Sequence, residues 1–74
     1  HIRVPYITDK SQVERFRNEY LERVEEIGEM VFWIPKSQIV KWDGMTETMI
    51  KNYVRYEWRS FNMTNTRLVI WLTK

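Results

Sequence analysis

Residues 49–61 read MIKNYVRYEWRSF and alternate apolar side chains with basic, polar or aromatic ones. At a period of two, this segment is a strand with one apolar face and one basic, aromatic face. Several of its apolar residues also share a stripe at helical spacing, so periodicity alone leaves both structures open. Residues 52–61 contain no Ala or Leu and are rich in Tyr, Val, Trp and Phe, which lose rotamer freedom in a helix. We therefore predict an extended segment.

The segments on either side of this stretch also favour strands. Upstream, MVFWI at 30–34 is closed by Pro35, and SQIVKW at 37–42 is closed by Asp43 and Gly44, a dipeptide typical of hairpin turns. Downstream, residues 62–65 predict a turn, and residues 67–73 predict a final strand in which alternate residues share a face.

The N-terminal third predicts one amphipathic helix. Residues 2–7 form a short apolar run with Pro5, which suits an edge strand or an extended arm. Thr8 and Asp9 are both suitable N-caps, and two pairs have the spacing of a capping box: Asp9 with Gln12, and Ser11 with Glu14. Gly28 stands where a C-terminal cap is expected. Between these caps, apolar residues recur at spacings of three and four, with Leu21 at the edge of their stripe: Val13, Phe16, Tyr20, Val24 and Ile27.

These elements predict a single α+β domain over residues 1–74, with one amphipathic helix packed on a small, mostly antiparallel sheet. If residues 46–60 are helical instead, the order becomes strand, helix, strand, strand, helix, strand, which is the ferredoxin-like βαββαβ pattern. A chain this short buries only about 60% of its unfolded surface, so a partner or a second copy would add to its stability.

Composition and charge exclude several classes of protein. The chain has no Cys, which excludes a disulfide scaffold and a thiolate metal site and favours a reducing, cytoplasmic location. No apolar run approaches the ~20 residues that cross a bilayer, so we expect no membrane partner. Residues 9–29 hold seven acids and four bases, whereas residues 30–74 hold seven bases and three acids. This uneven charge allows either internal attraction or two different outward faces.

The sequence lacks the groups of residues that carry catalysis or hold a cofactor. Its single His is His1, so the serines have no plausible base and a catalytic triad is excluded. Glu22, Glu26 and Glu29 share a helical face, which we interpret as a solvated acidic surface rather than a metal site. The two glycines lack the neighbours of a phosphate-binding loop. We therefore expect a non-enzymatic protein with no metal and no cofactor.

On the strand interpretation, cations and rings from two neighbouring strands share one side of the sheet. Aromatic faces stack unpaired bases at about 1–3 kcal/mol per base, and cations follow the phosphate backbone. This surface predicts an interface for single-stranded nucleic acid formed by Lys51, Tyr53, Arg55, Arg59, Arg67 and Trp71. The same pattern also fits a sheet whose cations only maintain solubility and whose rings are covered by the N-terminal arm or a second subunit.

Three large aromatic residues favour a protein contact instead. Phe32, Trp33 and Trp42 cannot all point inward if their strands alternate, so at least one of them lies at a surface. Exposed Trp is enriched among the residues that dominate protein interfaces. The leading hypothesis is a module that binds a protein, as an inhibitor or assembly factor; single-stranded nucleic-acid binding is the second, and self-association into an oligomer is the third.

Residues 33–39, with the sequence WIPKSQI, resemble a string found in small uncharacterised bacterial and phage accessory proteins, where it lies in a β-rich context. The resemblance covers seven of the 74 residues and implies no enzymatic activity. It favours the strand interpretation of residues 49–61 and implies a phage-type accessory protein that binds and modulates a host component.

Overall fold

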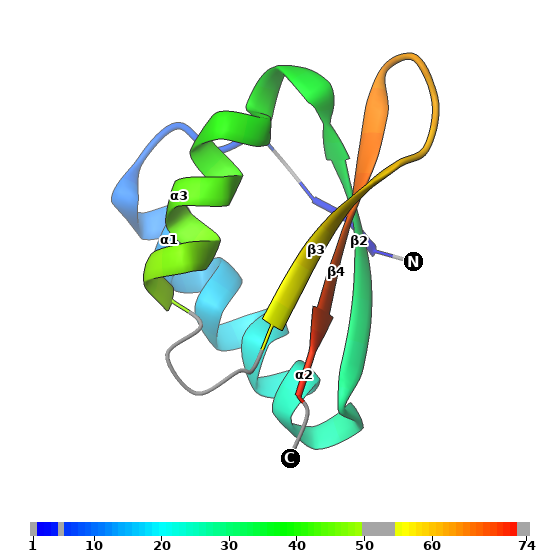
Figure 1. Cartoon of the computed structure of the whole chain (residues 1–74). Helices are drawn as coiled ribbons and strands as arrows, with labels where there is room; N and C mark the ends of the chain where they lie inside the picture. Colours follow the sequence, from blue (N-terminus) through cyan, green and yellow to red (C-terminus); the bar gives the residue numbers. More distant parts are fainter. Residues whose placement is uncertain (1, 5, 50–54, 73–74) are drawn as a thin grey trace.

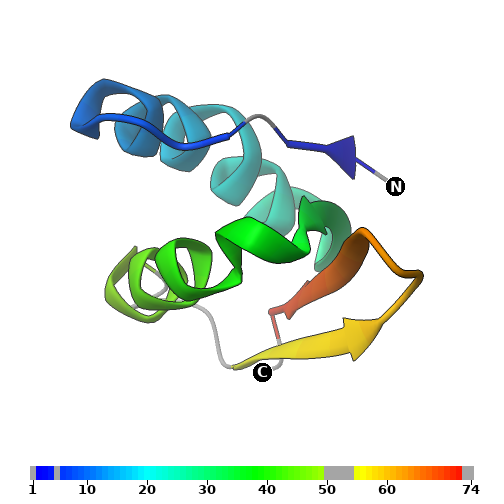
Figure 2. The same cartoon turned by 90° about the horizontal axis from the view of Figure 1, so that it is seen from above.

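The computed structural model of the chain describes residues 2–4, 6–49 and 55–72, and it consists of helices packed on one face of a sheet (Figure 1). Four strands form the sheet: β1 (Ile2–Arg3), β2 (Glu29–Pro35), β3 (Arg55–Ser60) and β4 (Asn65–Trp71). The helical elements are α1 (Lys10–Phe16), a π-helical turn (Arg17–Leu21), α2 (Glu22–Ile27), a 3-10 turn (Lys36–Gln38) and α3 (Ile39–Met49). Viewed from above, α1 and α3 again lie on the same side of the sheet (Figure 2).

The sheet is mixed but mostly antiparallel, with the strand order β1-β2-β4-β3. β1 runs parallel to β2, and β4 runs antiparallel to both β2 and β3. The register places Trp33 of β2 opposite Arg67 of β4, and Arg67 opposite Arg59 of β3. The predicted α+β class with a mostly antiparallel sheet is confirmed, but α3 adds a second helix to the single one that was predicted.

The predicted N-terminal helix is confirmed at both ends. The Asp9 side chain accepts a hydrogen bond from the Gln12 N–H at 3.1 Å, and the Gln12 side chain accepts one from the Asp9 N–H at 3.3 Å, which completes the capping box. At the other end, Gly28 has φ +92°, a left-handed conformation that glycine adopts without a steric penalty. Its N–H donates to the Val24 carbonyl and closes the helix.

One π-helical turn, Arg17–Leu21, changes which side chains the helix buries. Its wider turn shifts the apolar stripe, so Leu21 is 2% exposed although the sequence placed it at the edge of that stripe. Ile27, which was predicted on the stripe, is 67% exposed. The helix therefore buries Phe16, Leu21 and Val24 in the core.

The capping box makes the stability of the fold depend on pH. Hydrogen bonds from the Ser11 hydroxyl and the Gln12 N–H hold the pKa of Asp9 below its ordinary value. A carboxyl with a lowered folded-state pKa stabilises fully above its unfolded pKa of about 4, and this stabilisation is lost as the pH falls through the folded pKa. We expect the urea midpoint to fall below about pH 4, and to fall less in Asp9→Asn, which keeps an N-cap oxygen. Equal falls in the two proteins would contradict this role of Asp9.

The strand predicted over residues 37–42 is wrong, because this segment begins the helix α3. Trp42 and Thr46, one helical turn apart, are both buried, whereas Val40 is 86% exposed, so the inward stripe has helical spacing. The hairpin predicted at Asp43 and Gly44 is also wrong, since both residues lie inside α3. Burial of Trp42 outweighs the ~1 kcal/mol that a glycine costs in a helix interior relative to alanine.

The extended segment predicted within residues 49–61 is confirmed for Arg55–Ser60, which form β3. Met49 ends α3, and residues 50–54 lie outside the described residues. The observed order is strand, helix, strand, helix, strand, strand. Of the helix that the alternative order placed over residues 46–60, the structure shows residues 46–49.

An aromatic cluster joins the helices to the sheet. Phe16 of α1 packs edge-on against Trp42 of α3, with ring centroids 4.4 Å apart and ring planes at 82°. Phe16 and Tyr20 also contact Phe32 of β2, at centroid distances of 5.4 and 5.7 Å. Such pairs add about 0.5–1.5 kcal/mol each beyond the area that they bury. This core occupies the face of the sheet that the helices cover.

Candidate functional site

The face of the sheet opposite the helices carries arginines and aromatic rings. Because side chains alternate along a strand and paired residues share a face, the strand register fixes which residues belong to it. The residues that alternate with them on β2 and β4, such as Phe32 and Leu68, are fully buried under the helices. We call this second surface the open face; its basic and aromatic strand residues are Arg3, Trp33, Arg55, Arg59, Arg67 and Trp71.

Two guanidinium groups lie over the ring of Trp71. The Cζ of Arg55 is 4.2 Å from the ring centroid, and the Cζ of Arg59 is 5.3 Å from it. Both distances are within the ~6 Å over which a cation is attracted to an aromatic face, a contact that contributes about 0.5–1 kcal/mol at an exposed site. The contacts therefore order two long side chains beside an aromatic plane.

A second aromatic group lies nearer the turn between β3 and β4. Trp33 and Phe61 stack with their centroids 4.8 Å apart and their planes at 25°, and the Arg67 guanidinium is 4.8 Å from the Phe61 centroid. The Nε of Arg67 is buried and has no hydrogen-bond partner among the described residues. The Arg67 side chain as a whole is partly exposed, so an anion from solvent can approach the guanidinium group but not this buried Nε.

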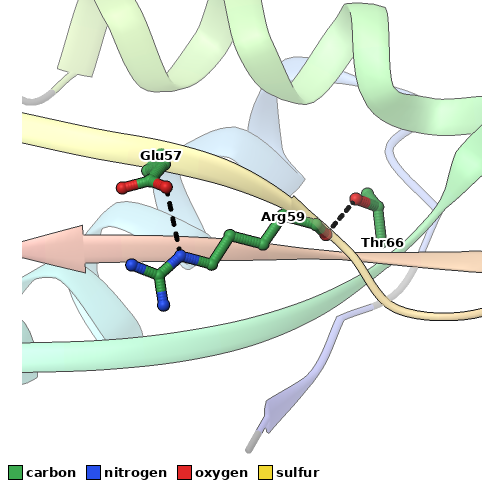
Figure 3. A network of polar contacts seen from close by, with 3 residues as sticks. All are labelled: Glu57, Arg59 and Thr66. Atoms are coloured by element: carbon green, nitrogen blue, oxygen red, sulfur yellow. Dashed lines mark hydrogen bonds and ion pairs between the residues drawn. The ribbon is translucent and has the colours of Figure 1, made fainter.

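Arginine outnumbers acid on the open face. The described strand residues on this face include four arginines but only two acids, Glu29 and Glu57. Glu57 accepts a hydrogen bond from the Arg59 Nε at 3.1 Å, in an ion pair whose two side chains are about half exposed (Figure 3). An exposed pair of this kind contributes about 0–1 kcal/mol, so another anion can replace Glu57 at little cost. The surface therefore keeps an excess of positive charge.

The structure brings together four of the residues predicted for nucleic-acid binding. Arg55, Arg59, Arg67 and Trp71 all lie on the open face, on the two strands of the C-terminal hairpin. The other two predicted residues, Lys51 and Tyr53, lie outside the described residues.

Sequence reasoning missed two members of the open face and placed a third on a different surface. Arg3 and Phe61, which follows β3 and stacks on Trp33, were not assigned to this surface, and Trp33 was assigned to a separate protein interface. Alternation along residues 29–35 does give Trp33 a fixed side. Only the pairing of β2 with β4 shows that this side is the one that carries Arg67.

Two of the three aromatic residues predicted at a protein interface are buried, so the prediction is wrong for them. Phe32 is 0% exposed and Trp42 is 1% exposed, and both belong to the hydrophobic core. The reason for Trp42 is that it lies on a helix, whose inward stripe it joins, and not on an alternating strand. Phe32 points to the helical side of β2, while Trp33 is half-buried on the open face.

Neither a metal centre nor a membrane span is evident in residues 2–4, 6–49 and 55–72. Over these ranges, the structure contains no group of three or more acidic or His side chains that could hold a metal ion. Glu22, Glu26 and Glu29 are each exposed. No helix in the same part of the chain is long and apolar enough to cross a membrane.

Comparisons of the chain with protein-family models, with curated proteins and with solved structures find no match. The geometry and charge of the open face are therefore the features that point to a function.

Proposed function

We propose that the chain is a binding module for single-stranded nucleic acid and that the open face is its binding surface. The observation that supports this most is the placement of arginine over aromatic rings, with Arg55 and Arg59 at Trp71 and Arg67 at Phe61. Unpaired bases stack on aromatic and guanidinium planes, while guanidinium N–H groups bind phosphate oxygens. The open face offers both contacts to an extended strand.

The two aromatic groups are spaced to engage separate bases. Along β4, Trp71 and Arg67 are four residues apart, which corresponds to about 13 Å at the rise of a strand. One base would stack at Trp71 and another at the Trp33–Phe61 pair, with arginines beside both. Arg67 is partly exposed beside Phe61, so its guanidinium group is placed to bind a phosphate next to the second base.

The structure weakens the support for the hypothesis that ranked first on sequence, a protein contact through exposed aromatics. Phe32 and Trp42 lie in the core, so Trp33 is the anchor that this hypothesis keeps. A contact centred on one half-buried Trp would depend on salt only weakly. Salt dependence therefore distinguishes the two functions.

We expect short labelled DNA or RNA single strands to bind with an affinity that falls linearly as log salt rises. Trp71→Ala should weaken binding about 5- to 150-fold, because it removes a stacking platform worth about 1–3 kcal/mol. Arg67→Ala should weaken binding of all sequences and reduce the salt slope by about one. Fluorescence anisotropy at two or more salt concentrations measures each of these quantities.

Arg23→Ala provides the matched control, because Arg23 is an exposed arginine on α2 rather than on the sheet. We expect it to bind as the parent does. Absence of binding at low salt, or equal loss in Arg23→Ala and Arg67→Ala, would overturn the proposal. A protein ligand that binds with little response to salt and is lost in Trp33→Ala would favour the protein contact instead.

A further inference from the structure

The outer edge of β3 is available for pairing. β3 is the last strand in the sheet order, and in the described part of the chain no strand pairs with its outer side. An edge of this kind presents a row of backbone N–H and C=O groups that can pair with another strand.

The hydrogen-bond pattern shows which residues of β3 direct their backbone groups to this edge. The Leu72 N–H donates to the Gly28 carbonyl, and because bonding alternates along a strand, even-numbered residues of β4 bond to β2 and odd-numbered ones to β3. The partners of the odd-numbered residues are Arg55, Glu57 and Arg59. Consistent with this, the Arg59 carbonyl faces β4, where it accepts a bond of 2.7 Å from the Thr66 hydroxyl (Figure 3). Tyr56, Trp58 and Ser60 therefore direct their N–H and C=O groups outward.

We infer that this edge pairs two copies of the chain into an antiparallel dimer with Trp58 at the two-fold axis. In that register Trp58 pairs with Trp58 of the second copy, and Tyr56 pairs with Ser60 in both directions, so every outward backbone group is used. Glu57 then stands opposite Arg59 of the second copy, and Arg59 opposite its Glu57. These are non-hydrogen-bonded positions, where facing side chains are closest.

The charges of β3 favour this register over the next possible antiparallel register, in which the two-fold axis passes through Glu57. With Glu57 at the axis, the two Glu57 side chains would face each other and Arg55 would face Arg59, so like charges would meet at each position. A parallel pairing in register would also oppose identical charges. Charged edge strands usually prevent pairing, but here the charges prevent only the wrong registers. The dimer would join two open faces into one wider surface, although the inference does not depend on nucleic-acid binding.

Charge reversal across the proposed interface tests the inference. Sedimentation velocity or light scattering of the parent should show a mass that rises with concentration from 9.2 kDa toward twice that value. Glu57→Arg and Arg59→Glu, studied singly, should each self-associate about tenfold more weakly or not at all, because like charges then face each other. An equimolar mixture of the two variants should recover the double mass, since the arginines of one copy now face the acids of the other.

The controls separate this interface from a general effect of charge or folding. The swap Glu57→Arg with Arg59→Glu in one chain restores both facing pairs and should dimerise like the parent. Arg23→Glu changes charge on α2, away from the sheet, and should leave dimerisation unchanged. A parent that stays monomeric to millimolar concentration, single variants that associate like the parent, or a mixture that stays monomeric would each overturn the inference.

Discussion

Trp42→Ala is expected to remove a large part of the protein's stability. Trp42 is 1% exposed and packs edge-on against Phe16, so its removal leaves a large cavity between α3 and α1. Truncating a buried aromatic residue to alanine costs about 3–5 kcal/mol. At about 0.05–0.15 kcal/mol per residue, a domain of this length has only roughly 4–11 kcal/mol of total stability. Urea titration followed by circular dichroism measures the loss.

Two variants show whether the loss comes from burial of the ring. Trp42→Phe keeps an aromatic ring and removes the indole Nε1, which is buried without a hydrogen-bond partner among the described residues. We expect it to lose only about 1–2 kcal/mol. Trp33→Ala makes the same chemical change on the half-buried open face and should also cost less than Trp42→Ala. A Trp42→Ala protein as stable as the parent would contradict the assignment of Trp42 to the core.

Asp43→Ala is expected to produce the second-largest loss, because one carboxylate joins α3 to β3. Its Oδ1 accepts hydrogen bonds from the Trp58 Nε1 at 2.7 Å and from the Tyr56 hydroxyl at 3.2 Å. Hydrogen bonds to a charged group contribute about 1.5–3 kcal/mol each, and partial exposure of this site reduces their sum to about 2–4 kcal/mol. Asp43→Asn keeps an acceptor oxygen and should lose less. Equal unfolding midpoints for the parent and Asp43→Ala would contradict this role.

The same contact makes stability sensitive to alkaline pH. Burial and the nearby Asp43 carboxylate raise the pKa of Tyr56 above its ordinary value. The unfolded tyrosine therefore loses its proton at a lower pH than the folded one, so stability decreases as the pH rises above about 10. Tyr56→Phe should make the unfolding midpoint less dependent on pH in this range, provided that Asp43 is retained. An unchanged dependence would show that other groups cause it.

The elements that the sequence predicts correctly have their determinants close together in the chain. The cap at Asp9 and the left-handed Gly28 set the ends of the first helix. The predicted turn at 62–65 is stabilised by the Asn62 side chain, which accepts bonds from the Thr64 and Asn65 N–H groups at 2.9 and 2.7 Å. Local signals of this kind can be read without knowledge of the tertiary structure.

The start of α3 could not be predicted because its determinants are distant in sequence. Gln38 is buried and its Oε1 accepts a bond of 2.9 Å from the N–H of Ile7, a residue 31 positions away. Thr46 is also buried, so the inward stripe of α3 includes polar residues that resemble a solvated face. Meanwhile Ile39 and Val40 suggested a strand although Val40 is exposed.

The candidate site also combines features that are local in sequence with features that depend on distant strands. Alternation along β3 and β4 is local, and it grouped Arg55, Arg59, Arg67 and Trp71 correctly on one face. The contribution of Trp33 depends on β2 pairing with β4, across more than thirty residues. Hydrophobic periodicity assigns a residue to one side of its own strand but does not say which strand lies beside it.

β4 comes last of the four strands in sequence yet lies between β2 and β3. During ribosomal synthesis, β3 lacks its partner strand β4, and β2 can pair only with the short β1, until residues 65–71 have emerged from the exit tunnel. Nascent chains that stop before that point would expose the β4-facing edges of β2 and β3 together with the apolar side of α3, a state that chaperones recognise and that proteases remove. Completion of the sheet is thus coupled to the final steps of translation of this segment.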